Sequence, residues 1–216
     1  MVRRGRIPNR RTRAREGGDG VRRLGTGPEF SALVSDGRVY LRHPRSADQD
    51  EFIALMQASS SFHRPWASAP TNEERFLVYL ADAGRPDFEA MLVCRCEDNA
   101  IAGFFNLSHI TRGALQSAYL GYAAGKPYAR QGYMRDGLEL VLEHAFSNLD
   151  LHRIEANIQP GNHASIALAR GAGFRREGFS RRYLKIGGRW RDHERWAILA
   201  EDWRTRAASL GIPIDS

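Results

Sequence analysis

The densest set of groups that could do chemistry lies between residues 120 and 174. An apolar strand ends at Leu120-Gly121-Tyr122, a loop follows, and Gly132 begins a long amphipathic helix. A second strand at 153–158 leads into another helix that starts near Asn162. The first backbone N–H groups of a helix lack intrahelical partners and lie at the positive end of its dipole. This layout predicts a site that holds a phosphorylated cofactor at a helix N-terminus.

Strands and helices must position these groups, and the hydrophobic pattern predicts where they lie. Alternating and apolar runs predict strands at 37–43, 88–94, 100–109, 117–123, 153–158, 182–186 and 190–199. Helical spacing predicts helices that begin at Ser46 and at a capping box starting with Thr71, and helices over 132–148 and 201–210. Residues 59–66 are expected as a loop, and Gly187-Gly188 as a hairpin turn. The order indicates one α+β domain.

The positive charge is concentrated at one end of the chain. The formal net charge is +7, and residues 1–26 hold nine arginines against Glu16 and Asp19, so the remainder is balanced. A segment so rich in Arg and Gly cannot bury enough apolar surface to fold alone. We expect a disordered tail over residues 1–36, a folded domain over 37–210 and a short tail over 211–216. The first tail either contacts RNA weakly or reflects composition alone.

Cys94 and Cys96 are the two cysteines, and their spacing on a predicted strand places them on the same face. We expect them to be small buried residues rather than parts of a disulfide or metal site. No apolar run approaches the roughly 18 residues of a membrane-spanning helix, and no secretory signal precedes the domain. A reducing, cytoplasmic setting is expected, with no membrane partner.

Several short strings occur in a fixed order along the chain. They are Tyr119–Tyr122, Gln131–Met134, Leu151–Asn157, Pro160-x-Asn162-x-x-Ser165, Gly173-Phe174, Glu177-Gly178 and Gly188–His193. With them the sequence resembles the GNAT acetyltransferase superfamily over residues 39–203, and in particular its RimJ-type branch of ribosomal-protein N-terminal acetyltransferases. The resemblance implies a single-domain GNAT fold, with a mixed central sheet flanked by helices.

The resemblance also implies that acetyl-CoA is the acyl donor. The family pattern Arg/Gln-x-x-Gly-x-Gly/Ala, which holds the pyrophosphate, matches residues 127–132 and keeps only its last glycine. That glycine could instead serve close helix–strand packing. The strand end would bind pantetheine as an added strand, and a backbone N–H there could polarise the thioester carbonyl. The residues implied for the donor are Leu120, Gly121, Tyr122, Arg130, Gln131, Gly132, Tyr133, Met134, Asn162 and Ser165, with Asn162 alternatively a helix cap.

Acetyl transfer needs a neutral amine, so a base, or water leading to one, must take a proton. Many relatives place a Glu where this sequence has Asn157, which cannot accept a proton. Glu155 lies two residues earlier on the same strand face and is the expected base or water-orienting group. Its alternative role is an ion pair with an arginine such as Arg153. Asn106 and His109 compete for the role, since histidine titrates in the right range, although a lone His near a strand end is often simply solvated.

The resemblance leaves the acid for the departing thiolate open. Many relatives have a Tyr where Ala169 stands here, so Ser165 or Tyr183 would have to contact the sulfur. Trp66 and His63 would form an aromatic wall of the acceptor cleft. Trp66 could equally anchor its loop on the core.

We therefore expect an N-acetyltransferase that acetylates an amine by direct attack in a ternary complex. The favoured acceptor is the N-terminal α-amine of a protein, such as a ribosomal one. The alternatives are a small amine, amino acid or antibiotic as acceptor, and a non-catalytic acyl-CoA-binding, RNA-associated module. No metal is expected, and the oligomeric state is open, with a dimer as one option.

Overall fold

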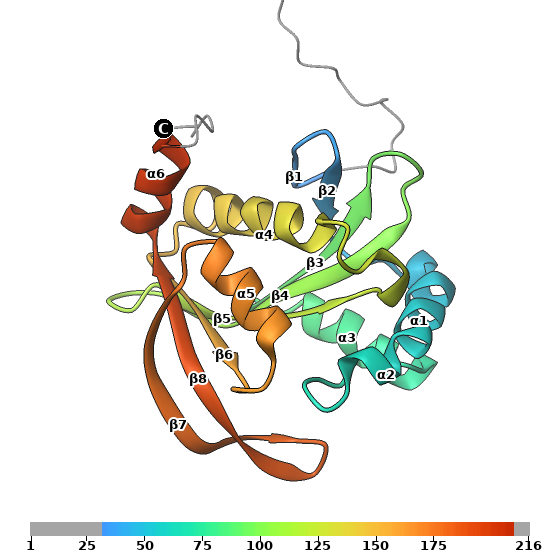
Figure 1. Cartoon of the computed structure of the whole chain (residues 1–216). Helices are drawn as coiled ribbons and strands as arrows, with labels where there is room; N and C mark the ends of the chain where they lie inside the picture. Colours follow the sequence, from blue (N-terminus) through green and yellow to red (C-terminus); the bar gives the residue numbers. More distant parts are fainter. Residues whose placement is uncertain (1–31, 210–216) are drawn as a thin grey trace, which may run out of the picture. The chain divides into compact units, whose positions relative to one another are not determined.

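The computed structural model describes residues 32–209. This part of the chain holds an eight-stranded sheet with the order β1-β2-β3-β4-β5-β6-β8-β7 (Figure 1). Neighbouring strands are antiparallel except β5 and β6, which run parallel. The strands are β1 (Val34–Ser35), β2 (Val39–Arg42), β3 (Phe88–Arg95), β4 (Ile101–Thr111), β5 (Ser117–Ala124), β6 (Arg153–Ile158), β7 (Arg175–Ile186) and β8 (Arg189–Leu199). The predicted α+β order with a mixed sheet is confirmed.

Helices cover both faces of this sheet (Figure 1). One group consists of α1 (Gln49–Ala58), α2 (Ser60–His63) and α3 (Glu73–Ala83), and the other of α4 (Tyr133–Glu143), α5 (His163–Gly171) and α6 (Ala200–Ser209). Each group encloses its own hydrophobic core. Met91, Phe105 and Val141 lie in the core beneath α4, and Phe52 and Phe76 in the core beneath α1 and α3. Because β3 is buried on both faces, its sequence is a continuous apolar run instead of an alternating one.

Helix α4 carries the loop on which the predicted phosphate site depends. Leu138 and Val141, which recur at helical spacing, are buried against the sheet. Gly137 allows the helix to approach closely, because a Cβ there would lie 2.9 Å from Val93 Cγ2. The helix continues into a π-helical turn, His144–Asn148. The prediction of a helix over 132–148 is confirmed, with its first residue acting as the N-cap.

Cys94 is buried in the core beneath α1 and α3, as predicted, whereas Cys96 packs against the same core but is only partly buried. Both are free thiols, and burial raises the pKa of Cys94 to about 11. Within residues 32–209 no group of His, Cys, Asp and Glu side chains has the arrangement of a metal site. No helix in the same range combines the length and apolar character needed to cross a membrane.

Four local predictions were wrong. Residues 59–66 include helix α2, which continues from α1 because His63 N donates to Ser59 O at 3.0 Å and no glycine or proline interrupts it. Asn72 caps α3 in place of Thr71, since its side chain accepts a hydrogen bond from the third helical residue. β7 begins seven residues earlier than expected, where exposure on both faces hides the alternation. β1 pairs with β2 inside the expected tail. The remainder of that tail, residues 1–31, lies outside the described residues.

Candidate active site

Strands β5 and β6 separate after a short parallel pairing. Their pairing joins Ser117–Tyr119 to Arg153–Glu155 and ends there. The Gln116 carbonyl, just before β5, points toward β6 and accepts a 3.1 Å hydrogen bond from the Arg153 backbone N–H. Because the direction of backbone groups alternates along a strand, every second residue of β5 after Gln116 also points its N–H and C=O toward β6. Leu120 and Tyr122 therefore direct N–H and C=O groups into the space that β6 has left. An extended ligand can pair with such groups as an added strand.

The loop before α4 forms a concave arrangement of N–H groups. Arg130 and Gly132 both have positive φ, 62° and 90°. The first hydrogen bond of the helix comes from Arg135 N, so the N–H groups of Tyr133 and Met134 lack intrahelical partners. Left-handed residues next to a helix N-terminus create an anion-binding concavity. Arg130 takes this conformation at the position where the family pattern has a glycine.

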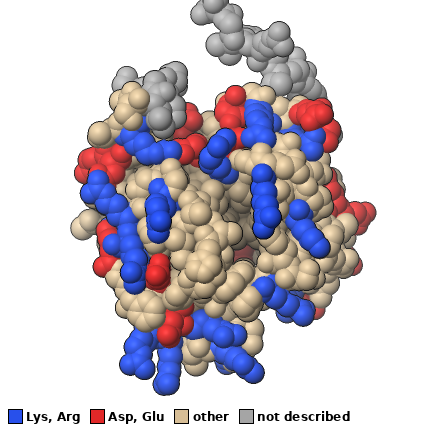
Figure 2. All heavy atoms as spheres, viewed as in Figure 1, with Lys and Arg blue, Asp and Glu red and all other residues tan. Residues whose placement is uncertain are grey.

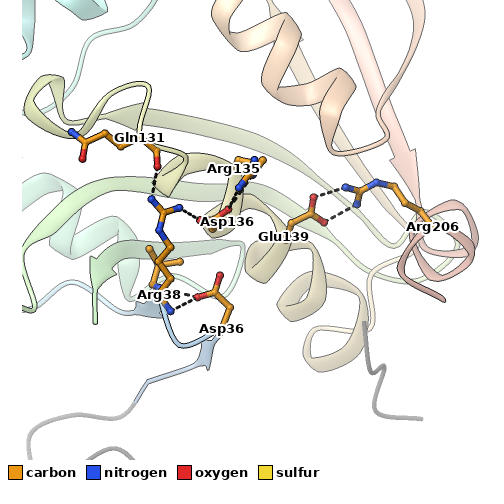
Figure 3. A network of polar contacts seen from close by, with 8 residues as sticks. Asp36, Arg38, Gln131, Arg135, Asp136, Glu139 and Arg206 are labelled. Carbon is orange, nitrogen blue, oxygen red and sulfur yellow. Dashed lines mark hydrogen bonds and ion pairs between the residues drawn. The ribbon is translucent and has the colours of Figure 1, made fainter. Parts of the chain in front are cut away.

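An ion network holds this loop in place (Figure 3). Arg38 pairs with the Asp136 carboxylate and donates a second hydrogen bond to the Gln131 carbonyl. Arg135 donates to Asp136 Oδ1 at 2.9 Å, and Asp36 accepts a 2.8 Å hydrogen bond from the Arg38 backbone. Asp136 would otherwise bring an unpaired negative charge to the first turn of α4. Because two arginines neutralise it, the helix N-terminus stays favourable for an anion.

A cavity of about 370 Å³ connects this loop with the gap beside β5. Figure 2 shows the molecule hollowed at its centre, with basic side chains on both sides of the hollow. The cavity is lined by Phe62, His63, Trp66, Ala67, Tyr122, Ala123, Ala124, Tyr128, Ala129, Arg130, Gly132, Met134, Arg135, Asn162, Ala164, Ser165 and Leu168. Of the ten predicted donor residues, six line the cavity. Leu120, Gly121, Gln131 and Tyr133 do not, although Leu120 contributes its backbone to the gap.

Asn162 and Ser165 begin α5 at the opposite wall of the cavity. Asn162 Oδ1 accepts a 3.2 Å hydrogen bond from Ser165 N, so the N-cap alternative for Asn162 is confirmed. The Tyr122 hydroxyl donates to the Ser165 carbonyl at 3.3 Å, and burial raises the pKa of Tyr122 to about 12. This contact links β5 to α5 on the side of the sheet that faces α4.

Trp66 and His63 close the wide end of the gap. His63 is buried, and its Nε2 donates to the Ala124 carbonyl at 2.7 Å, which satisfies the last backbone acceptor of β5. Gln159 Nε2 donates to the Trp66 carbonyl at 3.1 Å, and a Cβ on Gly161 would lie 3.0 Å from Trp66 Cη2. The segment after α2 is thereby joined to the β6–α5 loop. Trp66 thus anchors its loop and lines the cavity at the same time, and Gln159 was missed by sequence reasoning.

Glu155 lies where the pairing of β5 and β6 ends, on the sheet face opposite α4. Its Oε1 accepts from Arg153 Nε at 3.0 Å and its Oε2 from Arg195 Nη2 at 2.9 Å. Burial alone would raise the pKa of Glu155, but hydrogen bonds from Arg195 and Arg153 outweigh it and hold the pKa below its usual range. Arg153 also pairs with Glu177. This geometry favours the ion-pair alternative over a general base, because a carboxylate with a lowered pKa is a weak base.

Two aromatic hydroxyls lie beside this cluster. A hydrogen bond with Tyr183, together with burial, raises the pKa of Tyr119. The Tyr183 ring packs edge-on against His193 with centroids 6.1 Å apart. Burial lowers the pKa of His193, and its Nδ1 donates to the Arg191 carbonyl at 3.0 Å. Tyr183, one of the two side chains expected to contact the sulfur, therefore lies beside His193 and beside Arg195, whose guanidinium carbon is 6.0 Å from the Tyr183 ring centroid and which also binds Glu155.

Of the other residues named from the sequence, Asn157 lies on β6 beside the gap, whereas Asn106 and His109 lie on β4, across β5 from it. Asn106 pairs with Gly121 across β4 and β5, and its Oδ1 accepts from the Tyr79 hydroxyl at 3.1 Å. Asn157 Oδ1 is buried and has no hydrogen-bond partner among the described residues. His109 is exposed with φ 53° at a bulge of β4. From the sequence, Asn157 was notable only because it cannot act as a base. The structure adds that its amide oxygen lies beside the gap without a hydrogen-bond partner in the described chain.

A family model described as an acetyltransferase (GNAT) domain matches residues 38–175. The chain belongs to the GNAT acetyltransferase family. It is therefore an N-acetyltransferase, and acetyl-CoA is the acyl donor of this family. The predicted GNAT fold is confirmed.

Three relatives are informative. "Probable N-acetyltransferase YjcK" of Bacillus subtilis is 31% identical over 172 residues, covering 76% of this chain and 95% of that protein. The uS5-alanine N-acetyltransferase of Escherichia coli is 36% identical over 107 residues, which span 50% of this chain and 55% of the relative. The structure of Mycobacterium smegmatis RimJ in complex with CoA-disulfide has a TM-score of 0.71 at 29% identity, and covers 80% of this chain and 89% of that one.

Proposed function

We propose that this acetyltransferase transfers acetyl from acetyl-CoA to the N-terminal α-amine of a protein. The observation that carries the proposal is the charge of the sheet face around Glu155. Glu155 is engaged by two arginines, and Glu177 shares one of them. No carboxylate of this cluster is free to pair with a polycation such as a polyamine. A polypeptide N-terminus brings only one amine to be neutralised.

The donor would enter from the side of α4 and α5. The N–H groups of Tyr133 and Met134, with the Arg130 guanidinium, would hold the pyrophosphate, and the backbone groups of Leu120 and Tyr122 would pair with the pantetheine amides. The cavity supports this assignment because it joins both sets of groups. A bound acetyl-CoA supplies the acetyl group as a thioester, which a backbone N–H at the gap can polarise.

The acceptor amine would approach from the opposite sheet face. Its nitrogen must be neutral to form the new C–N bond, and the proton it releases passes to solvent. We propose that Asn157 Oδ1 accepts a hydrogen bond from this amine, since it is buried at the gap with no other partner in the described chain. Glu155 would orient Arg195 and a nearby water and would remain ionised. Ser165 would contact the sulfur of the departing thiolate.

The experiment is thiol release from acetyl-CoA, followed with DTNB, against a panel of acceptors. The panel holds peptides that start with Ala, Ser or Thr, then spermidine, free amino acids and an aminoglycoside. Turnover with the peptides is expected, and the same peptides with a blocked N-terminus should be inert. Turnover with only the small amines would replace the proposal by a small-molecule acetyltransferase. Binding of acetyl-CoA in calorimetry, with no turnover of any acceptor, would favour a non-catalytic module.

Relatives that are named for a protein substrate support a peptide acceptor. Relatives named for acetylation of a ribosomal-protein alanine match this chain at 36% identity over half its length. Spermidine acetyltransferase structures are also similar, but at 19–20% identity they show the fold alone. The charge around Glu155 is therefore the feature that favours the peptide.

A further inference from the structure

The hairpin of β7 and β8 concentrates positive charge next to the proposed acceptor face. Residues 175–199 contain eight Arg and Lys residues against three Asp and Glu residues, a net charge of +5. Figure 1 shows the hairpin extending past β6, and Figure 2 shows basic side chains clustered at this end of the molecule. A basic projection of this kind attracts an acidic partner.

The strand register places one row of these cations on the acceptor face. Arg195 is opposite Asn157, so the two side chains lie on the same side of the sheet. Every second residue of β8 shares that side, which adds His193, Arg191 and Arg189 toward the turn. A row of arginines therefore leads from the proposed acetylation point toward the tip of the hairpin.

The outer two arginines of this row are not neutralised within the described chain. Arg195 is committed to Glu155, but Arg189 and Arg191 make no ion pair with any residue between 32 and 209. The Nε of Arg191 also lacks a hydrogen-bond partner there. Asp192, the acidic residue nearest to them in the sequence, accepts a 2.7 Å hydrogen bond from the Arg182 backbone. These two guanidinium groups retain capacity for carboxylates.

We infer that Arg189 and Arg191 bind acidic side chains of the acceptor polypeptide, downstream of the amine that is acetylated. The inference rests on the proposed function, a protein N-terminus as acceptor. An extended chain advances about 3.3 Å per residue, so Arg191 and Arg189 lie roughly 13 and 20 Å along β8 from Arg195. A peptide that starts at the gap and runs along β8 would bring roughly its fourth to seventh residues to these arginines. The substrate class is thus a protein with acidic residues shortly after its first residue.

The exposed aromatic residues of the hairpin favour a peptide over single-stranded nucleic acid as the occupant. Trp190 and Phe179 are 61% and 47% exposed. Trp190 alternates with Arg189 and Arg191, and Phe179 is opposite Glu194, so both aromatics lie on the other face. Nucleic-acid grooves combine basic and stacking side chains on one surface. The arginine row offers charge without an exposed stacking platform.

The test compares three alanine-first peptides of equal length, which differ only in having Glu, Gln or Lys at the fourth to seventh positions. We expect kcat/KM for the Glu peptide to exceed that for the Gln peptide by about five- to tenfold at about 0.05 M salt, with the Lys peptide lowest. The Glu preference should disappear at about 0.5 M salt. The double variant Arg189→Gln/Arg191→Gln should abolish the preference while turning over the Gln peptide at the wild-type rate. A matched control, Arg112→Gln/Arg204→Gln, removes one positive charge from the β4–β5 turn and one from α6. This control should keep the preference for the Glu peptide.

The outcomes separate this inference from the proposed function. Equal turnover of the three peptides by the wild-type enzyme overturns the inference and leaves the peptide acceptor intact. Turnover of none of them, with spermidine accepted, overturns the proposed function itself. A preference lost equally in the control variant would reflect net charge alone and would also overturn the inference. Loss of binding to a single-stranded RNA oligonucleotide in the hairpin variant, with the Glu preference retained, would assign the row to RNA.

Discussion

Replacing Glu155 by Gln distinguishes two possible roles of this residue, a catalytic base and an ion-pair partner that holds Arg153 and Arg195 in place. The Glu155 side chain is 14% exposed and receives one hydrogen bond from each of two arginines, Arg153 and Arg195. The substitution removes both charge interactions and turns an amide N–H₂ toward one guanidinium. Hydrogen bonds to charged groups contribute roughly 1.5–3 kcal/mol when buried, but these arginines are 20% and 40% exposed, and Arg153 keeps Glu177. We expect a loss of about 1–2 kcal/mol in the free energy of unfolding at pH 7.

The stability difference has a definite pH dependence. The pKa of Glu155 is lowered in the folded protein, so its contribution to stability is fully present above the unfolded pKa of about 4.3. It is lost as pH falls through the lower, folded pKa. Urea unfolding of both proteins at pH 7 and pH 5.5 should give the same difference, which shrinks only below about pH 4.3. Glu177→Gln is the matched control, because it shares Arg153 but is 48% exposed, and it should cost about 0–1 kcal/mol.

The kinetic consequence distinguishes the two roles. Loss of a general base costs about 10²- to 10⁴-fold in turnover, whereas loss of an anchor for Arg195 should cost less than about tenfold. With Glu155 ionised throughout neutral pH, the wild-type rate should follow the amine itself and rise toward an α-amino pKa of about 8. The assay is DTNB-detected thiol release with an alanine-first peptide between pH 6 and 9. A loss above a hundredfold in Glu155→Gln, with unchanged stability and unchanged binding of acetyl-CoA, would refute this reasoning and restore Glu155 as the base.

Three further substitutions test the donor side. Gly132→Ala forces a left-handed alanine whose Cβ would lie 2.9 Å from Arg38 Nη1, so we expect about 1–2 kcal/mol of destabilisation and a KM for acetyl-CoA raised about tenfold, measured by unfolding and initial rates. Tyr122→Phe removes the hydrogen bond to Ser165 and should cost about 1 kcal/mol of stability, with no change in the pH–rate profile below pH 10, because its pKa is about 12. Gln159→Ala frees the segment after α2 and should raise the acceptor KM by about three- to tenfold at unchanged kcat; an altered kcat with constant KM would contradict this role.

Local patterns were sufficient to predict the elements that form the proposed donor site. The α4 helix was found because apolar residues recur at helical spacing. The cap at Asn162 was found because Asn is a preferred capping residue. The Gly187-Gly188 turn was found because both residues need positive φ, and they have 56° and 78°. In each case the physical cause acts within a few residues of the signal, so a single sequence contains it.

The acceptor side could not be predicted to the same extent, because its contacts join residues far apart in the chain. Glu155 was assigned a possible partner two residues away, Arg153, but Arg195 reaches it only because β6 and β8 pair in one register. His63 was expected to touch the acceptor, yet it donates to the Ala124 carbonyl on a strand 61 residues later. Alternation along β8 could have predicted which sheet face Arg195 occupies. It could not have predicted that Arg195 lies opposite Asn157, because this depends on the register of β6 and β8. Strand register is set by the whole sheet.

The sequence departs from the family pattern at Arg130, Asn157 and Ala169. The backbone conformation and the contacts of the first two residues are compatible with catalysis. A missing glycine at Arg130 would matter if the loop had lost its left-handed turn, but Arg130 keeps φ at 62°. An arginine there costs about 1 kcal/mol relative to glycine and in return brings a cation to the proposed phosphate site. Asn157 cannot act as a base, yet its Oδ1, which has no partner between residues 32 and 209, can accept a hydrogen bond from an amine, whereas a Glu paired like Glu155 could not. The first two departures are therefore compatible with an active enzyme. The third, Ala169 in place of a Tyr, removes a hydroxyl, and Ser165 is the cavity-lining residue that we propose contacts the sulfur in its place.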